Sequence, residues 1–396
     1  MKASRKGEGT VQAIAGDPAK TLLFVRSLKL TDFRNYARAE LELDARPVVL
    51  VGENGAGKTN LLEAVSLLGP GHGLRGRHYD ELCRKDGAGG FAVAARVVSR
   101  GDEVEIGTGL VAGHEEAAGR TVRIAGKERS AGALAEYVNL VWLIPAMDGL
   151  FTGPASERRR FLDRLVLAVD PKMRSPLGRY DRAMRQRNRL FQMREGSRAL
   201  FEGLEEQMAE TGVAIAAARL EATARLAGLI ERMLAERGDG PFPWAAVALE
   251  GRLEAALGTR SATEVEDEFR RRLEEGRERD RAAARALEGP HVSDLLVFHG
   301  PNEAPAAQCS SGEQKALLVG LILAKVELIK ALEGKAPIVL LDEVAAHLDA
   351  ARREALFGQI LALKCQAWMT GTDRDLFAPL AQEAQIFRVN RGMIGA

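Results

Sequence analysis

Apolar and polar residues alternate in two segments near the start of the chain, at residues 23–30 and 39–43, in the manner of β-strands. The next segment, residues 47–51, is a continuous apolar run that leads into a glycine-rich stretch. Residues 59–68 then carry apolar side chains at helical spacing. The pattern therefore predicts a buried strand, a glycine-rich loop and a helix in succession.

The rest of the chain divides into two kinds of pattern. Further strands are expected at residues 90–98, 103–111 and 121–124, and a central one at 339–341. Between them, the composition changes to Ala, Leu, Arg and Glu at helical spacing, with an interruption near residue 238. We therefore predict an α/β domain made from both ends of the chain around a mainly helical insert. The expected divisions are a disordered leader at 1–21, the α/β domain at 22–155 and 288–396, and the insert at 156–287.

Composition narrows the class of protein. The 396 residues carry a formal net charge of only +1, so any binding to nucleic acid needs a local basic surface. Aromatic residues make up 5% of the chain, which disfavours a protein that stacks single-stranded bases. Cys83, Cys309 and Cys365 are isolated, which argues against a zinc site or a disulfide framework and fits a reducing cytoplasm.

The sequence also argues against a membrane protein. Its longest apolar run, residues 316–324, is much too short to span a bilayer. The first residues include several cations but lack the apolar core of a secretory signal. We expect a cytoplasmic protein with no membrane partner.

The glycine-rich stretch has the G-x-x-x-x-G-K-[ST] pattern of a phosphate-binding P-loop. Glycines let backbone N–H groups wrap the phosphates, and the following helix adds the positive end of its dipole. Lys58 is expected to reach the β- and γ-phosphates of ATP as a catalytic residue, and Thr59 to bind Mg²⁺. A plain turn before a helix is the weaker alternative, because the flanking strand and helix are both predicted. The ATP-binding residues would be Gly52, Glu53, Asn54, Gly55, Ala56, Gly57, Lys58, Thr59 and Asn60.

Two adjacent carboxylates, Asp342 and Glu343, follow the predicted central strand. They should lie at the carboxyl end of the sheet, where ligands bind in open α/β folds. Asp342 can hold the metal, and Glu343 can orient and polarise the attacking water as general base. Capping of the next helix is the alternative, and the presence of the P-loop favours the catalytic interpretation.

A third motif, Ser310-Ser311-Gly312-Glu313-Gln314, begins a strongly helical segment. By itself it predicts a capping box with Ser311 as N-cap and Gln314 at the third helical position. It also resembles the signature loop of ABC-type ATPases, which reaches across a dimer to the partner's ATP. Ser311, Gly312 and Gln314 are therefore further ATP-binding candidates, and ATP would form part of a homodimer interface. The two interpretations are compatible, because a capped helix start is also an anion site.

Smaller segments extend this resemblance. Leu348-Asp349 resembles the D-loop of these ATPases, and residues 370–373 lie where the switch loop is found. The usual switch histidine is absent, so Thr370 or Thr372 would have to contact the γ-phosphate. A local turn is the alternative at this position. Residues 142–148 are expected to link the sheet to the helical lobe in place of the family's glutamine loop.

Segments outside the ATP motifs resemble one family closely, the bacterial recombination mediators called RecF. The match extends in order from about residue 22 to the C-terminus. Two departures are that Val292 stands where the family usually has Arg, and that Asp342-Glu343 replaces a frequent Asp-Asp. The segments that carry the resemblance are 28–36, 52–64, 156–163, Arg187-Asn188, Gly289-Pro290-His291 with Asp294, and 311–315.

The resemblance implies an ABC-type P-loop ATPase head with an inserted helical lobe. It further implies weak ATP hydrolysis with Mg²⁺, ATP-dependent dimerisation, and binding to gapped or junction DNA, both single- and double-stranded. The implied role is to help RecR, with RecO, place RecA on DNA in repair, replication restart and the SOS response. The alternative is the ATP-hydrolysing head of another ABC/SMC-type system. The arginine-rich insert argues against a subunit that couples ATP to a membrane transporter. The same insert is too short to form the long coiled-coil arm of an SMC-like tether.

The residues themselves support a DNA-binding surface at the start of the insert. From Arg158 to Arg194 there are twelve basic and three acidic residues, an excess of nine positive charges. Such a surface would bind phosphates without reading sequence, and binding would depend on salt. The alternative is a solvated helical face with internal ion pairs. The DNA-contact candidates are Arg158, Arg159, Arg160, Arg185, Arg187 and Arg189.

Overall fold

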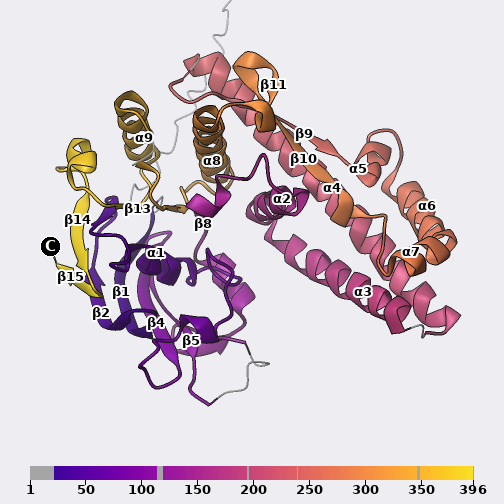
Figure 1. The fold of residues 1–396 in the computed structure, drawn as a ribbon, viewed down its shortest axis with the longest axis horizontal. Coiled ribbons are helices and arrows are strands. Elements are labelled where there is room, and N and C mark those ends of the chain that lie inside the picture. Colours follow the sequence, from indigo (N-terminus) through magenta and orange to yellow (C-terminus); the bar gives the residue numbers. More distant parts are fainter. Residues whose placement is uncertain (1–21, 114–118, 194–195, 239, 346–347, 396) are drawn as a thin grey trace, which may run out of the picture.

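The computed structural model describes residues 22–113, 119–193, 196–238, 240–345 and 348–395, and the predicted leader lies outside them. Figure 1 shows an α/β part that carries both the N-terminal strands and the C-terminal helices and strands. The helices of the central segment lie to its side. The α/β class is that predicted from the hydrophobic pattern.

The core of the α/β part is a sheet in the order β15-β14-β3-β13-β12-β8. Its inner strands are parallel, and only β15 runs antiparallel to its neighbour. All residues of β3 and β12 are buried, which explains why both appear in the sequence as unbroken apolar runs. The strands are β3 (Val48–Val51), β8 (Leu140–Leu143), β12 (Ile338–Leu341), β13 (Ala367–Gly371), β14 (Gln385–Asn390) and β15 (Met393–Gly395).

A second, antiparallel sheet is formed by the N-terminal part of the chain in the order β2-β1-β4-β5-β6-β7. Buried and exposed positions alternate along parts of β1 and β4, as expected for strands with one face on the core. The strands predicted near residues 23, 39, 90, 103 and 121 are all present. They are β1 (Leu23–Phe33), β2 (Tyr36–Glu42), β4 (Phe91–Ser99), β5 (Asp102–Leu110), β6 (Thr121–Ile124) and β7 (Lys127–Arg129).

Three α-helices lie among the described residues of the α/β part. The helix α1 starts in the P-loop, and α8 is buried along much of its length. No helix among the described residues is both long and apolar enough to cross a bilayer. The three helices are α1 (Lys58–Ser66), α8 (Ser311–Glu333) and α9 (Ala350–Leu363).

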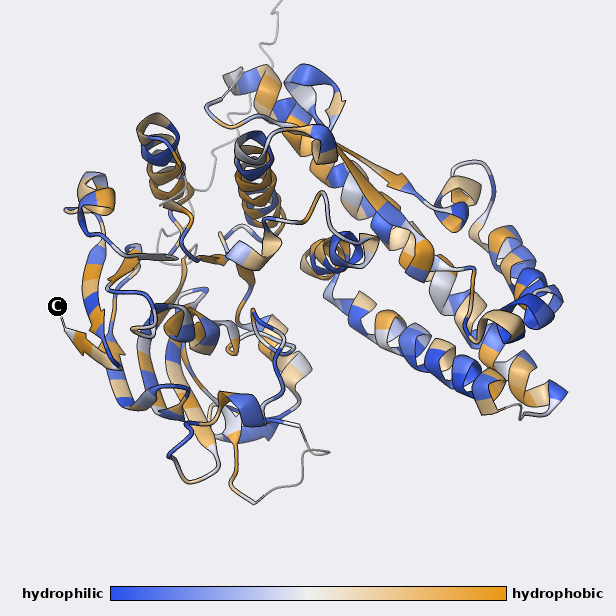
Figure 2. Ribbon diagram, viewed as in Figure 1, coloured by the Kyte–Doolittle hydropathy of each residue, from blue (hydrophilic) through white to orange (hydrophobic). Residues whose placement is uncertain are grey.

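The central segment is mainly helical, as predicted, and its longest helix α4 has 40 residues. Figure 2 shows that hydrophilic residues dominate α3 and α6. Both helices have a small buried apolar stripe, which packs on the rest of the lobe. The helices are α2 (Ala155–Val169), α3 (Arg174–Met193), α4 (Arg198–Arg237), α5 (Arg252–Leu257), α6 (Ala262–Glu275) and α7 (Arg277–Ala283).

A small antiparallel sheet has the order β11-β10-β9, and its strand β9 was not expected within the predicted helical insert. Its strands are β9 (Ala245–Glu250), β10 (Asp294–His299) and β11 (Ala304–Pro305). The sequence of β9 is Ala-Ala-Val-Ala-Leu-Glu, which favours a helix by intrinsic propensity, and pairing with β10 overrides that preference. Residues on both sides of position 288 therefore pack together, while the division into domains remains a prediction.

Candidate nucleotide-binding site

The glycine-rich loop leaves β3 and enters α1, the context that a P-loop requires. Gly52 has no room for a side chain, because a Cβ there would lie 2.2 Å from the backbone oxygen of Val389 in β14. Gly57 has a φ of 116°, which L side chains rarely adopt. These two glycines therefore shape the loop, whereas residues 53–55 are exposed.

Lys58 begins α1 and turns its side chain back over the loop. Its Nζ donates to the carbonyl oxygens of Gly52 at 2.7 Å and Glu53 at 2.9 Å. The residue is only 4% exposed, and burial lowers the pKa of its amine while the nearby carboxylates of Glu343 and Asp342 oppose that shift. Because carbonyls are neutral acceptors, an anionic phosphate would offer this ammonium a stronger partner.

Asp342, which directly follows β12, joins the start of α1 to the end of β13. Its Oδ1 accepts a hydrogen bond from the Thr59 hydroxyl at 2.9 Å and another from Thr370 at 2.8 Å. The strand order explains this convergence, because β13, which contains Thr370, lies between β3 and β12. The P-loop and the carboxylate pair, 283 residues apart in the chain, are thus in direct contact.

The donor atoms at this point suit Mg²⁺. A hydroxyl and a carboxylate are hard oxygen ligands, and Mg²⁺ commonly takes one or two such groups together with phosphates and waters. The described residues contain no group of three or more His, Cys, Asp and Glu side chains able to hold a metal by themselves. Thr59 and Asp342 would therefore hold Mg²⁺ in company with a nucleotide.

Glu343 is held in an unusual backbone conformation beside Asp342. Its φ is 55°, in the left-handed region, and its backbone N–H donates to the Thr370 hydroxyl at 2.8 Å. Strain of this kind in a non-glycine residue is common at functional sites. The Thr370 hydroxyl is engaged with Asp342 and Glu343, so the suggested γ-phosphate contact would require it to change partners, whereas Thr372 is exposed.

The turn between β1 and β2 clamps the P-loop, a role that the sequence did not reveal. Tyr36 donates its hydroxyl to the Gly57 carbonyl at 3.0 Å, and Asn35 donates to the Ala56 carbonyl at 3.1 Å. Asn35 also accepts a hydrogen bond from Asn60 at 2.8 Å. The hairpin therefore holds both the loop and the first turn of α1.

A buried ion pair ties the same hairpin to the middle of α1. Arg34 contacts both carboxylate oxygens of Glu63, at 2.8 and 3.0 Å. The Glu63 side chain is 1% exposed and also lies 3.4 Å from Arg75. The sequence signal for this pair was a glutamate on the apolar face of the predicted helix.

The helix after the signature motif begins one residue earlier than expected. The N-cap is Ser310, which forms a capping box with Glu313, so the prediction of Ser311 and Gln314 in these roles is wrong. Both serines are followed three residues later by a suitable partner, and the structure selects the pair with Glu. Gln314 instead donates to the Cys309 carbonyl at 2.8 Å.

The shifted cap leaves the signature motif open at the surface. Ser311 and Gly312 are exposed, and a Cβ on Gly312 would meet nothing within 4 Å. Lys315, one turn further on, pairs with Asp148 at 3.0 Å. Residues 142–148, the segment expected to link the sheet to the helical lobe, are therefore joined to α8, the helix that starts in the signature motif.

Two proteins with similar sequences carry the same name. A protein of Mesorhizobium japonicum called DNA replication and repair protein RecF is 54% identical over 381 residues, which cover 96% of this chain and 98% of the relative. A relative of the same name from Brucella suis biovar 1 is 53% identical over 372 residues, covering 93% and 95%. The family model described as RecF/RecN/SMC N terminal domain matches residues 24–394.

The chain belongs to the RecF family.

Solved structures confirm the fold of an ABC/SMC-type head. A structure described as the recombination mediator protein RecF-ATPrS in the RecFOR pathway has a TM-score of 0.81 at 22% identity, covering 95% of this chain and 98% of that one. An Smc head domain from Pyrococcus furiosus has a TM-score of 0.52 at 16% identity, covering 94% and 95%. At these identities the likeness concerns the fold alone.

The arginines expected to contact DNA in this RecF-family chain differ in where they lie. Arg187 is 0% exposed and donates to Glu205 at 2.9 Å and Asp280 at 2.6 Å. The prediction that Arg187 contacts DNA therefore needs correction: its guanidinium joins α3, α4 and α7 inside the lobe. The buried partners lie far along the chain, so the local count of charges did not reveal them.

Two more of these arginines serve mainly internal contacts. Arg158 binds both carboxylate oxygens of Asp294, at 2.8 and 2.7 Å, and its side chain is 15% exposed. Arg159 donates to the Ser293 carbonyl at 2.8 Å, and burial, with a smaller effect of Arg219, lowers its pKa. Both therefore attach α2 to the start of β10.

The remaining candidates lie at the surface. Arg160 and Arg185 pair with neighbours on their own helices, Glu157 and Asp181, each at 2.5 Å. Arg189 is also exposed on α3. Local ion pairs of this kind contribute little to stability, so both paired arginines can exchange their partner for a phosphate.

Proposed function

We propose that the chain is an ATP-dependent DNA-binding recombination mediator of the cytoplasm, active in DNA replication and repair. The single observation that supports it most is the convergence of Thr59 and Thr370 on Asp342 beside Lys58, which brings the P-loop and the carboxylate pair together. The relatives' shared name, DNA replication and repair protein RecF, supports the biological role. A solved structure with a similar fold, described as the recombination mediator protein RecF-ATP, supports ATP as the nucleotide.

The proposed ATP chemistry follows from the side chains already described. Lys58 would neutralise phosphate charge, and Thr59 and Asp342 would hold Mg²⁺, which stabilises negative charge on the phosphates. Glu343 would orient a water molecule and accept its proton. The other loop residues, from Gly52 to Asn60, would contribute mainly backbone N–H groups, as P-loops do.

Dimerisation is proposed from the exposed signature motif. Ser311 and Gly312 start a long helix whose first N–H groups have no partner within the helix, and such a helix start attracts anions. A second copy of the chain would place its bound ATP against this surface, with Gln314 nearby. ATP binding would then create the dimer, and hydrolysis, which we propose to be weak, would release it.

The proposed partners complete the role. Arg160, Arg185 and Arg189 offer exposed charge to DNA, and we propose gapped or junction DNA, with single- and double-stranded parts, as the substrate. The dimer on DNA would help RecR, with RecO, to load RecA in repair, replication restart and SOS induction. Nothing in this arrangement reads base edges, so binding would be independent of sequence.

Sedimentation velocity with and without ATP and gapped DNA tests the proposal. The wild-type chain should be a monomer without ATP and a dimer with it, and Lys58→Met should remain monomeric. Ser311→Arg should bind ATP as a monomer, whereas Glu343→Gln should hold the ATP-bound dimer. A Ser311→Arg variant that still dimerises would contradict the proposed interface.

The chain offers a matched control for Ser311→Arg. Ala262 is the first residue of α6, which has the same kind of capping box, formed by Ser261 and Glu264. Ala262→Arg therefore places the same bulk and charge at the same helical position in the other lobe. This variant should dimerise with ATP like the wild type.

A further inference from the structure

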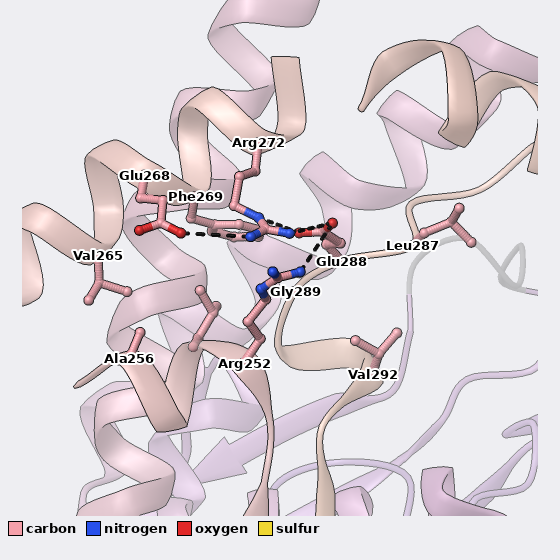
Figure 3. Close-up of a pocket in the computed structure, with 11 residues that line it drawn as sticks. Arg252, Ala256, Val265, Glu268, Phe269, Arg272, Leu287, Glu288, Gly289 and Val292 are labelled. Carbon is pink, nitrogen blue, oxygen red and sulfur yellow. Dashed lines mark hydrogen bonds and ion pairs between the residues drawn. The ribbon is translucent and has the colours of Figure 1, made fainter. Parts of the chain in front are cut away.

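A hollow at the outer part of the helical lobe is unrelated to the nucleotide site. It has a volume of about 210 Å³ and lies between α5, α6 and the segment 287–292. Figure 3 shows Val265 on one side of it and Leu287 and Val292 on the other. This space is large enough to admit one large apolar side chain.

The lining is apolar at its base and remains apolar at its rim. Val265 and Phe269 are each 2% exposed and Leu253 is 6% exposed, so the base of the hollow belongs to the core of the lobe. Leu287 and Val292 are 39% and 54% exposed, and belong to the few large apolar side chains that the described part of the chain leaves in water. Exposed apolar groups gathered at a hollow mark a binding surface.

Several arginines contact the two carboxylates that line this hollow. Glu288 accepts two hydrogen bonds from Arg272, at 2.7 and 2.8 Å. Two further arginines reach the same carboxylate only at long range, Arg252 at 3.7 Å and Arg279 at 3.5 Å. Figure 3 shows Arg252 and Arg272 both directed at Glu288.

Glu268, the second carboxylate at the hollow, also has arginine partners. It pairs with Arg260 and lies 3.7 Å from Arg272. Arg252 and Arg272 line the hollow together with Glu268 and Glu288, and Arg260 and Arg279 reach these carboxylates from outside the lining, so four arginines share two carboxylates. The side chains of Arg252 and Arg279 are each 66% exposed, so both can turn to an incoming anion.

We propose that this hollow binds an acidic segment of a partner protein that carries one large apolar side chain. The apolar side chain would occupy the space between Val265 and Leu287, and flanking carboxylates would pair with Arg252 and Arg279. Charge complementarity supports this choice, and the apolar rim disfavours a nucleic-acid backbone, which offers phosphates but no apolar anchor. The site goes beyond the ATP-driven function and does not depend on it.

Fluorescence anisotropy with labelled peptides tests the site on the full chain. The probe is a peptide in which one Phe is flanked on each side by three Asp or Glu residues. Two comparison peptides replace the Phe with Ser, or the acidic residues with Asn and Gln. The Phe-containing acidic peptide should bind at least about fivefold more tightly than either. Equal binding of the three, or no binding at millimolar concentration, would overturn the proposal.

Matched substitutions locate the binding on the protein. Leu287→Ser should weaken the peptide about fivefold or more, while Leu332→Ser, at a leucine of nearly the same exposure on α8, should leave it unchanged. Arg252→Glu should weaken it as well, in contrast to Arg232→Glu at an exposed arginine of α4. Equal effects within either pair, or displacement of the peptide by a short DNA duplex, would exclude the proposed occupant.

Discussion

Thr59 and Thr370 donate hydrogen bonds to the same oxygen of Asp342, at 2.9 and 2.8 Å, from opposite ends of the chain. The position of the carboxylate therefore depends on both hydroxyls. Thr370 has a second role, because its oxygen also accepts the backbone N–H of Glu343. A single buried side chain thus positions the metal ligand and the proposed general base together.

We predict that Thr370→Val lowers kcat for ATP hydrolysis by roughly 10- to 100-fold with little change in KM, because a shift of about 1 Å in catalytic groups has such effects. The unpaired Glu343 N–H should also reduce the free energy of unfolding by about 1–3 kcal/mol. Steady-state kinetics and urea unfolding measure both. The exposed Thr372→Val is the control, and an unchanged kcat for Thr370→Val would contradict this role.

Arg34→Met should destabilise the chain by roughly 3 kcal/mol, because it leaves the buried Glu63 carboxylate with only the longer contact to Arg75. ATP affinity should fall as well, since the Arg34 hairpin holds the P-loop. Urea unfolding and nucleotide titration measure the two effects. The control is Arg46→Met, which removes an exposed pair with Asp44 and should cost about 0–1 kcal/mol.

Arg187→Met should reduce the free energy of unfolding by about 3–5 kcal/mol, because Glu205 and Asp280 would lose a buried partner. Arg189→Ala, two residues further on the exposed side of α3, should change stability by less than about 0.5 kcal/mol. Denaturant unfolding of both variants separates the internal arginine from the surface one. Equal stability losses would show that burial does not distinguish them.

Arg189→Ala should instead weaken DNA binding and reduce the slope of log affinity against log salt by about 0.9, the value for one phosphate contact on duplex DNA. Anisotropy with a labelled duplex at several salt concentrations measures this slope. Arg232→Ala, on α4, is the matched control for the loss of one exposed charge. An unchanged slope for Arg189→Ala would remove this residue from the DNA surface.

His291 makes the stability of the helical lobe sensitive to acid. Burial lowers its pKa below the ordinary value of about 6.5, and its Nδ1 lies 2.7 Å from the Tyr180 hydroxyl while Nε2 lies 3.0 Å from the Ala286 carbonyl. These contacts suit the neutral ring, with Nε2 donating and Nδ1 accepting. Because the unfolded state takes up the proton first, stability is present above about pH 6.5 and is lost as the pH falls.

His291→Gln should therefore lose less stability than the wild type between pH 7.5 and pH 5.5. Urea unfolding at several pH values measures the difference. The exposed His78→Gln should follow the wild-type profile and controls for the loss of a histidine outside the lobe. Parallel profiles for all three proteins would exclude His291 as the source.

The candidate nucleotide-binding site could be located in the sequence because its motifs are local. The P-loop pattern and the carboxylates after an apolar strand each occupy a few consecutive residues, and both strands are buried as predicted. The contact between Thr59 and Asp342 depends on the strand order, which no single segment contains. The cap was displaced by one residue because Ser310 and Ser311 both satisfy the same local rule.

Other features depend on distant parts of the chain and could not be found locally. Whether Arg187 faces solvent is decided by Glu205 and Asp280, the second of them 93 residues away. The strand β9 is stabilised by β10 against its own helical propensity. The number of basic residues in the insert could therefore be read from the sequence, but which of its arginines are buried and which are exposed could not.

The position of β3 in its sheet has a consequence for synthesis of the protein. Both of its neighbours, β13 and β14, come from residues 367–390, more than 300 residues later in the chain. While the ribosome produces the intervening segment, the P-loop strand has no native partner on either side and is open to wrong pairing. The nascent chain should therefore gain the ability to hold nucleotide only in the last moments of translation, and chains released before β14 should not gain it at all.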